Sequence, residues 1–283
     1  MGLFARERIE PKSTDELLRM RAAGLLVART LDLLRGEVRA GRTTKDLDIV
    51  AEEFIRDNGG TPNFLGYQGF TGTICTSVND EIVHGIPGPR VLGDGDLLSI
   101  DCGAIVDGWH GDAAVSLVVG GAQAARPEDL ALVAATEDSL WAGISALRAG
   151  QSLYAVGAAV EDSLVSAGGR DGRVYGIVED YVGHGIGRAM HMDPQVPNYR
   201  VSGRGPRVVV GTTVAIEPMV TLGDQDNRVL ADDWTVVTLD GSRAAHWEHT
   251  VAVTDAGLWV LTALDGGEER LGRGGAAYGP VER

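Results

Sequence analysis

Two aspartates, Asp101 and Asp112, stand eleven residues apart in the apolar segment LLSIDCGAIVDGWHGDAAVSLVV. The Asp107-Gly108 pair between them is a strong signal for a two-residue hairpin turn. With that turn, Gly103 pairs with Asp112 and both carboxylates project from one face, about 7–8 Å apart at Cα. Carboxylates on one buried face repel each other unless a cation lies between them; the alternative is that one or both reach solvent at a strand edge. The segment favours a metal site.

Two glutamates also occur among apolar residues. Glu217 in TTVAIEPMVTL has no adjacent Lys or Arg, so its burial would require either an ion-pair partner or a metal ion. Glu248 in HWEHTVAV stands near the start of an expected strand, where a glutamate by itself is commonly solvated. Taken singly, neither glutamate separates a metal ligand from a structural or solvated residue.

The segment YVGHGIGRAMHMDP holds two histidines, His184 and His191, seven residues apart. The glycines around His184 argue against a regular helix and favour a loop or bulged strand whose backbone approaches a ligand closely. His84 in VNDEIVHGIPG follows an expected strand and precedes a turn, a common place for a catalytic side chain. A single histidine is usually an ordinary core or surface residue, whereas two in one glycine-rich segment favour a functional role.

Together these segments supply four acids and one or two histidines. Such oxygen-rich ligands suit two divalent ions of the Mn, Fe or Co kind better than a thiolate zinc site, because Cys75 and Cys102 are the only thiols in the chain. Two ions about 3.5–4 Å apart bridge a hydroxide and stabilise the oxyanion of a hydrolytic step. The motifs HExxH, GxSxG, GxxxxGKS/T and CxxC are absent from the sequence.

Hydrophobic periodicity predicts the elements that must position these residues. We expect four helices, over residues 14–38, 43–58, 128–148 and 152–166. Thr14 or Asp15 would be the N-cap of the first helix and Thr44 that of the second, and Gly168-Gly169 would end the last. We expect strands around residues 72–84, 97–119, 206–220, 234–240 and 245–254.

An internal similarity relates the two halves of the chain. Residues 38–60 align without a gap with residues 147–169, sharing Arg-Ala-Gly, one Glu and a terminal Gly-Gly. This indicates a duplication, with helix-helix-strand halves at about residues 12–122 and 126–262 that share one sheet; the alternative is a chance similarity of two glycine-capped helices. We expect one catalytic domain over residues 1–265 and a frayed, glycine-rich tail over residues 266–283.

Composition narrows the function further. The 283 residues carry 40 Asp and Glu against 25 Lys and Arg, a net charge of -15 that disfavours direct nucleic-acid binding. No apolar run approaches the ~20 residues of a membrane span, and the N-terminus lacks the apolar core of a secretory signal. We therefore expect a soluble, cytoplasmic protein without membrane contact.

The ordered motifs resemble those of the type I bacterial class of methionine aminopeptidases. Each motif alone is modest, but their order and spacing are highly specific over residues 11 to 262, nearly the whole chain: His84-Gly-Ile-Pro, Asp101 and Asp112, Gly-His184-Gly-Ile-Gly with His191, Ile-Glu217-Pro, and Glu248-His-Thr. The resemblance implies an α/β (α+β) pita-bread fold, a duplicated sandwich whose pseudo-two-fold halves share a central antiparallel sheet with helices outside.

The resemblance also implies roles for these residues. Asp101 would chelate one divalent ion, His184 and Glu217 the other, and Asp112 and Glu248 would bridge both. A hydroxide between the two ions would attack the first peptide bond, with Glu217 as a proton shuttle. His191 would stabilise the oxyanion and His84 would contact the scissile amide nitrogen. The two ions would be Co, Mn, Fe or Zn.

The methionine pocket implied by the resemblance would be lined by Tyr67, Phe70, Cys75 and Trp234. Phe70 and Met190 stand where bacterial relatives often carry Tyr and Phe, and His246 stands where they often carry Gln. An ideal hairpin around Asp240-Gly241 would put Trp234 and Glu248 on opposite faces, so either a bulge intervenes or Trp234 does not belong to the pocket.

The implied activity is removal of the N-terminal methionine from newly made polypeptides with a small second residue. Its partners would be nascent chain N-termini, including those at the ribosome, and the enzyme would be a monomer. The alternatives are an Xaa-Pro peptidase of the same fold and a non-catalytic pita-bread binding protein. The first usually carries a substantial N-terminal domain, and the second loses metal ligands that are all present here.

Overall fold

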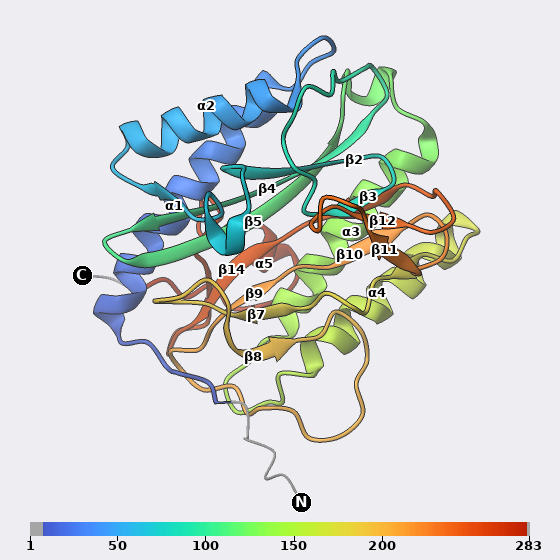
Figure 1. Cartoon of the computed structure of the whole chain (residues 1–283). Helices are drawn as coiled ribbons and strands as arrows, with labels where there is room; N and C mark the ends of the chain where they lie inside the picture. Colours follow the sequence, from blue (N-terminus) through green and yellow to red (C-terminus); the bar gives the residue numbers. More distant parts are fainter. Residues whose placement is uncertain (1–7, 282–283) are drawn as a thin grey trace, which may run out of the picture.

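The computed structural model describes residues 8–281, so residues 1–7 of the expected domain and residues 282–283 of the expected tail lie outside the described part. The chain runs twice through two long helices and then strands, as the internal similarity predicts (Figure 1). No helix of residues 8–281 is both long and apolar enough to cross a membrane.

The first helix pair is formed by α1 (Thr14–Glu37) and α2 (Thr44–Asp57). Ser13 and Thr43 are the N-caps, so the caps expected at Thr14 or Asp15 and at Thr44 are wrong by one residue. Each cap hydroxyl accepts the backbone N–H of the acid three residues on, and that carboxylate accepts the backbone N–H of the cap. This reciprocal pairing places each cap before the residue that composition alone indicates.

The strands of the first half form a four-stranded antiparallel sheet around β4. Asp107 and Gly108 adopt positive φ (51° and 75°) and form the predicted two-residue turn. Gly103 pairs with Asp112, so the register derived from that turn is confirmed. The strands are β1 (Thr61–Pro62), β2 (Ile74–Val78), β4 (Leu97–Val106) and β5 (Trp109–Val118).

The second helix pair is formed by α3 (Pro127–Ala146) and α4 (Ala155–Asp171). Helix α4 does not end at Gly168-Gly169 as predicted but continues to a C-cap at Gly172, which adopts the left-handed conformation (φ 67°). A Cβ at Gly168 would lie 2.5 Å from the carbonyl oxygen of Arg173, so Gly168 allows a close backbone approach inside the helix.

The second half contributes a five-stranded antiparallel sheet in the order β15-β14-β9-β7-β8. The strand expected over residues 206–220 is shorter, because β9 ends where Glu217-Pro218 begins and a proline cannot donate to the ladder. The strands are β7 (Gly183–Gly185), β8 (Met192–Val196), β9 (Thr213–Ile216), β14 (His249–Val253) and β15 (Leu258–Val260).

Two three-stranded sheets complete the strand layer, in the orders β13-β10-β6 and β11-β12-β3. The hairpin expected around Asp240-Gly241 is wrong, since β12 pairs with β11 and β3 while β13 pairs with β10. The elements are β3 (Glu81–Val83), β6 (Gly176–Ile177), β10 (Met219–Thr221), β11 (Asn227–Val229), β12 (Val236–Thr238), β13 (Ala244–His246) and the 3-10 turns η1 (Tyr67–Gly69) and η2 (Gly121–Gln123).

The two halves meet where β5 lies beside the start of β14 (Figure 1). Glu248 N–H donates to the Ala114 carbonyl oxygen at 3.0 Å, and Ala114 N–H donates to the Glu248 carbonyl oxygen at 3.3 Å. The predicted shared sheet is therefore a set of smaller sheets, of which the two largest join at this reciprocal pair. A core of buried residues from α1, α2, α3 and both large sheets packs across the junction.

The glycine-rich tail is ordered rather than frayed over the residues that the structure describes. It contains α5 (Glu268–Arg273), whose Leu271 is fully buried in the main core. Farther along, Tyr278 forms a parallel bridge with Leu258 of β15. The prediction of a frayed tail is wrong, because apolar residues among the glycines find a place in the core.

Candidate metal centre and adjoining pocket

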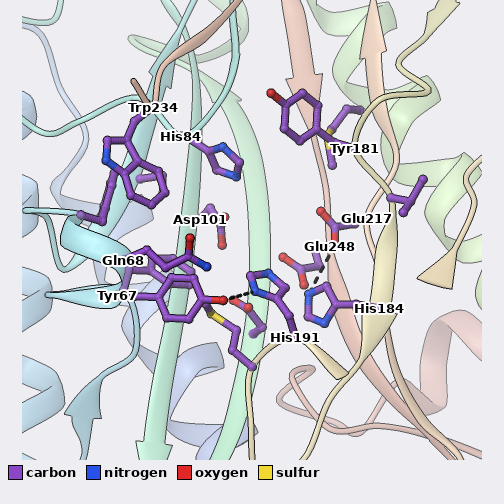
Figure 2. Close-up of a pocket in the computed structure, with 17 residues that line it drawn as sticks. Tyr67, Gln68, His84, Asp101, Tyr181, His184, His191, Glu217, Trp234 and Glu248 are labelled. Atoms are coloured by element: carbon purple, nitrogen blue, oxygen red, sulfur yellow. Dashed lines mark hydrogen bonds and ion pairs between the residues drawn. The ribbon is translucent and has the colours of Figure 1, made fainter. Parts of the chain in front are cut away.

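A cavity of about 300 Å³ opens between the two halves. Figure 2 shows Asp101, His84 and Tyr67 facing His184, Glu217 and Glu248 across it. Every candidate site residue predicted from the sequence lines this one cavity: Tyr67, Phe70, Cys75, His84, Asp101, Asp112, His184, His191, Glu217, Trp234 and Glu248.

The two aspartates come from the β4–β5 hairpin. Asp101 pairs with Ala114, two residues beyond Asp112, so both carboxylates project from the same face of the hairpin. The Oδ1 atoms of Asp101 and Asp112 are buried and have no hydrogen-bond partner. The alternative of a solvated strand edge is excluded, because β5 is flanked by β4 and by the start of β14.

The other half supplies His184, Glu217 and Glu248. His184 lies in β7 next to a shift in register, the bulged strand that its flanking glycines predict. A Cβ at Gly185 would lie 2.1 Å from the carbonyl oxygen of Asp193, which only glycine permits. Glu217 follows β9 and Glu248 precedes β14, so both end up at strand termini facing the aspartates.

Distances between ligand atoms fit a metal centre. One ligand atom each of Asp112, His184 and Glu248 lies within 4.8 Å of the other two. Glu217 joins this group through His184, whose Nε2 atom is 3.5 Å from Glu217 Oε1. Glu248 Oε1, like the aspartate oxygens, is buried without a hydrogen-bond partner. A donor set of carboxylates and one imidazole suits hard to borderline divalent ions.

The electrostatics of the cluster also favour a bound cation. Burial raises the pKa of Asp101 to about 7, and burial together with the neighbouring carboxylates raises the pKa of Asp112, Glu217 and Glu248 well above the usual range. Burial lowers the pKa of His184 to about 4, so its imidazole is neutral and free to act as a ligand near neutral pH. Among residues 8–281, no lysine or arginine lines the cavity. Four acids that cannot all ionise alone become a favourable site when divalent charge is added.

His191 and His84 stand above the carboxylates from opposite sides. The His191 ring packs at 4.4 Å from that of His184, and its Nδ1 atom lies 2.9 Å from the Tyr67 hydroxyl. Burial lowers the pKa of His191, and burial with the nearby His191 lowers that of His84 to about 4. His84 adopts positive φ (60°), uncommon for a residue with a Cβ and frequent at functional sites.

The rest of the cavity is an apolar chamber. Phe64, Phe70, Cys75 and Met190 form one buried cluster there, with Tyr67 and Trp234 packed against it. Trp234 comes from the loop before β12 and meets the Phe70 ring edge-on at 5.0 Å. Trp234 thus lines the cavity although no hairpin forms around Asp240-Gly241, and the register of β12 against β3 shifts between Val236 and Val237, just after this residue.

Several lining residues lie outside the set that the sequence predicted: Phe64, Gln68, Tyr181, Val182, Met190 and Met219. The ring of Tyr181 meets that of His84 edge-on at 5.5 Å. Tyr181 stands three residues before His184 in the glycine-rich segment, and this position in the sequence could have indicated a place in the site. Gln68 adopts positive φ (48°) in η1, and nothing in its sequence context indicates this. His246, named only for its unusual residue type, lies with Nε2 3.8 Å from Glu217 Oε2.

The sequence is similar to that of a large group of peptidases. The model of metallopeptidase family M24 matches residues 18–255. "Methionine aminopeptidase 1" of Mycobacterium tuberculosis is 52% identical over 261 residues, covering 92% of this chain and 97% of that protein. "Methionine aminopeptidase 1" of Bacillus subtilis is 45% identical over 253 residues, with 89% and 98% covered.

Solved structures agree with the sequence matches. Methionine aminopeptidase of Thermotoga maritima superposes with a TM-score of 0.85 at 38% identity, covering 90% of this chain and all (100%) of that one. The prolidase of Pyrococcus furiosus superposes with a TM-score of 0.69 at 18% identity, covering 89% of this chain and 65% of that one. The prolidase thus shares the fold, and the structures similar in both sequence and fold are aminopeptidases.

Proposed function

The chain belongs to metallopeptidase family M24, and from this premise we propose how its pocket acts as a methionine aminopeptidase, removing the N-terminal methionine of polypeptides. One observation carries the assignment to this site: the carboxylate-imidazole cluster and the apolar chamber with its two sulfur atoms open into the same cavity. A cluster alone would indicate only a metal, and a chamber alone only an apolar ligand.

Asp101, Asp112, His184, Glu217 and Glu248 would hold two divalent ions. The ions would supply Lewis acidity and lower the pKa of water enough to make a nucleophile near neutral pH. The unpartnered buried oxygens of Asp101, Asp112 and Glu248 and the neutral imidazole of His184 suit the binding of such ions. We propose Mn, Fe, Co or Zn, since all four accept such ligands.

The chamber would receive the methionine side chain. Phe70, Cys75 and Met190 offer an apolar, polarisable surface that suits an unbranched thioether. A side chain seated there would bring the first peptide bond close to the carboxylates and to His84 and His191, which line the same cavity.

His191 would stabilise the developing oxyanion. The Tyr67 hydroxyl lies 2.9 Å from Nδ1, and donation from this hydroxyl would leave the imidazole proton on Nε2 as a hydrogen-bond donor. His84 would contact the scissile amide nitrogen from the opposite side, and Glu217 would move a proton toward it. Because the pKa of His84 is about 4, its ring is neutral and can donate or accept near neutral pH.

We also propose a preference for a small second residue, cytoplasmic action on nascent chain N-termini, including those at the ribosome, and a monomeric enzyme. The side chains of His84, Gln68 and Tyr181 also line the cavity and would restrict the space beside the scissile bond. Comparing release of methionine from Met-Ala-Ser and Met-Leu-Ser peptides tests the preference, and equal kcat/KM values for the two would contradict it.

The function is tested by stripping the protein of metal and titrating it with Mn²⁺, Fe²⁺, Co²⁺ and Zn²⁺ while measuring methionine release from Met-Ala-Ser. A peptide that begins with Ala-Pro is assayed in parallel as a substrate for Xaa-Pro peptidases. Metal-restored release of methionine alone supports the proposal and ranks the metals. Cleavage before proline would indicate an Xaa-Pro peptidase, and metal binding without any cleavage would indicate a binding protein.

A further inference from the structure

The junction between the two halves carries an unusual pattern of hydrogen bonds. Ala114 and Glu248 exchange two backbone bonds, as in an ordinary antiparallel ladder. Continuing that register would pair Asp112 with Thr250 on one side and Ser116 with His246 on the other. In both of those pairs a side-chain hydroxyl replaces the backbone of one partner.

Thr250 makes the bridge on the metal side. Its Oγ1 atom accepts the backbone N–H of Asp112 at 3.1 Å and donates to the backbone carbonyl of Asp112 at 2.8 Å. Ser116 makes the equivalent bridge on the other side, accepting the N–H of His246 at 2.9 Å and donating to its carbonyl at 2.8 Å. Each hydroxyl thus satisfies a donor and an acceptor of the facing strand, and it reaches farther than a backbone group.

The remaining polar groups of Thr250 are already engaged. Its backbone N–H donates to Thr262 Oγ1 at 3.0 Å, and its carbonyl accepts the N–H of Leu261 at 2.8 Å. The hydroxyl is therefore the group of Thr250 that bonds to Asp112. The residue is fully buried, so water does not replace the bond if the hydroxyl is removed.

We propose that Thr250 is a positioning residue of the metal centre: its hydroxyl holds the backbone of Asp112 against the strand of Glu248 and so sets the separation of the two carboxylates that would bridge the ions. The inference rests on the proposed function. Asp112 and Glu248 belong to different halves, and metal sites tolerate displacements of only about 0.5 Å in their ligands. The hydrogen bonds at the junction hold the two strands with this precision, and the bond from the Thr250 hydroxyl is the one made to Asp112 itself.

The test compares three variants of the whole protein: Thr250→Val, which removes the hydroxyl at nearly constant volume, Thr250→Ser, which keeps it, and Ser116→Ala, which removes the bridge away from Asp112. Metal-stripped protein is titrated with Co²⁺ by calorimetry, and the visible absorption of bound Co²⁺ and the metal-free melting temperature are recorded. Steady-state kcat and KM for Met-Ala-Ser are measured at saturating Co²⁺.

Thr250→Val is expected to weaken Co²⁺ binding by about 10–100-fold, as for other residues that orient metal ligands, and to change the Co²⁺ absorption. It should lower kcat more than it changes KM, because the methionine chamber is untouched. Thr250→Ser should restore all of these values to near those of the unchanged protein. Ser116→Ala should lower the melting temperature but leave the Co²⁺ affinity within about threefold, since it does not contact a ligand residue.

Unchanged Co²⁺ affinity and absorption in Thr250→Val would overturn the inference. Equal losses of Co²⁺ affinity in Thr250→Val and Ser116→Ala would also overturn it, because they would show that the whole junction has loosened. If the valine variant does not fold, Thr250→Ala removes the same hydroxyl and is judged by the same criteria. When the unchanged protein binds Co²⁺ and releases methionine, these outcomes bear on Thr250 alone. Failure of the unchanged protein in either respect would overturn the proposed function and this inference with it.

Discussion

At the scale of single residues, the site is defined by polar atoms that lack partners. Buried polar groups in proteins are nearly always hydrogen-bonded, so an orphan requires an explanation. Here Asp101, Asp112 and Glu248 each have a buried oxygen without a hydrogen-bond partner, and the three share one cavity. A divalent ion accounts for all three at once.

Replacing Asp101 by Asn or Glu248 by Gln should abolish methionine release at limiting metal, because each substitution removes a charged ligand while keeping the side-chain volume. Metal affinity by calorimetry and activity at limiting Mn²⁺ or Co²⁺ check this. Asp57→Asn, at an exposed acid at the end of α2, is the matched control and should behave like the unchanged protein. Unaltered kcat at limiting metal in either site variant would refute the ligand assignment.

His191→Ala should behave differently, keeping the metal while lowering kcat by about 10²-fold or more, as when one oxyanion donor is removed. Tyr67→Phe removes the hydroxyl that contacts His191 Nδ1 at 2.9 Å and should cost less, because the imidazole itself remains. Metal content by elemental analysis and kcat on Met-Ala-Ser are the measurements. A fully active, metal-loaded His191→Ala enzyme would remove this residue from the mechanism.

At the scale of elements, the site depends on how closely helix α1 packs against the strands. A Cβ at Gly24 would lie 2.2 Å from the carbonyl oxygen of Leu261, just beyond β15. A Cβ at Gly36, farther along the same helix, would meet nothing within 4 Å. The two glycines share a helix and a residue type but stand in opposite surroundings.

Alanine substitutions at these two positions should therefore have opposite signs. Gly24→Ala should destabilise the protein by about 1–3 kcal/mol, because the helix must move away from the strands. Gly36→Ala should stabilise it by about 0.5–1 kcal/mol, the ordinary gain for alanine over glycine in a helix. Urea unfolding of the metal-free variants measures both free energies, and a shift of the same sign for both would contradict the packing seen at Gly24.

At the scale of the whole molecule, the metal centre lies between the halves. The hairpin of the first half supplies Asp101 and Asp112, and the second half supplies His184, Glu217 and Glu248. An ion bound to both halves stabilises the folded chain relative to the unfolded one by mass action. Without it, the carboxylates of the two halves oppose each other across the junction.

The metal-free protein should lose stability as the pH rises from 6.5 through the folded-state pKa values of its buried carboxylates, that of Asp101 being about 7. Its buried carboxylates, including Asp101 with a pKa of about 7, keep protons when folded that they release when unfolded, so raising the pH favours unfolding. Below the ordinary histidine pKa of 6.5, stability should instead rise with pH. His84 and His184 stay neutral when buried, whereas the same histidines bind protons in the unfolded chain.

Melting temperatures of metal-free and Mn²⁺-saturated protein across that pH range provide the measurement. The metal-saturated protein should show a flatter profile, because bound ions keep the carboxylates ionised. A metal-free melting temperature that rises as the pH passes from 6.5 through about 7 would contradict the raised pKa values of the cluster.

Local patterns were enough to predict much of this architecture. The Asp107-Gly108 turn determines the register of the β4–β5 hairpin, because the pairing of a two-residue hairpin follows from its turn. The glycines around His184 correctly indicate a bulged strand. The site residues could be collected from short motifs because each motif lies in one contiguous segment.

The features that the sequence did not reveal depend on pairing between distant segments. A hairpin around Asp240-Gly241 would have placed Trp234 by a local turn. Instead β12, which follows Trp234, pairs with β3 about 150 residues away, and no local turn specifies such a contact. Gln68 and Tyr181 reach the cavity only because the halves face each other. The same holds for the hydroxyl bridge from Thr250 to Asp112. The residue types and their order along the chain thus determined the candidate ligands and the fold class. The tertiary structure alone decided how the two halves meet, because non-local strand pairing and packing leave no short-range signal.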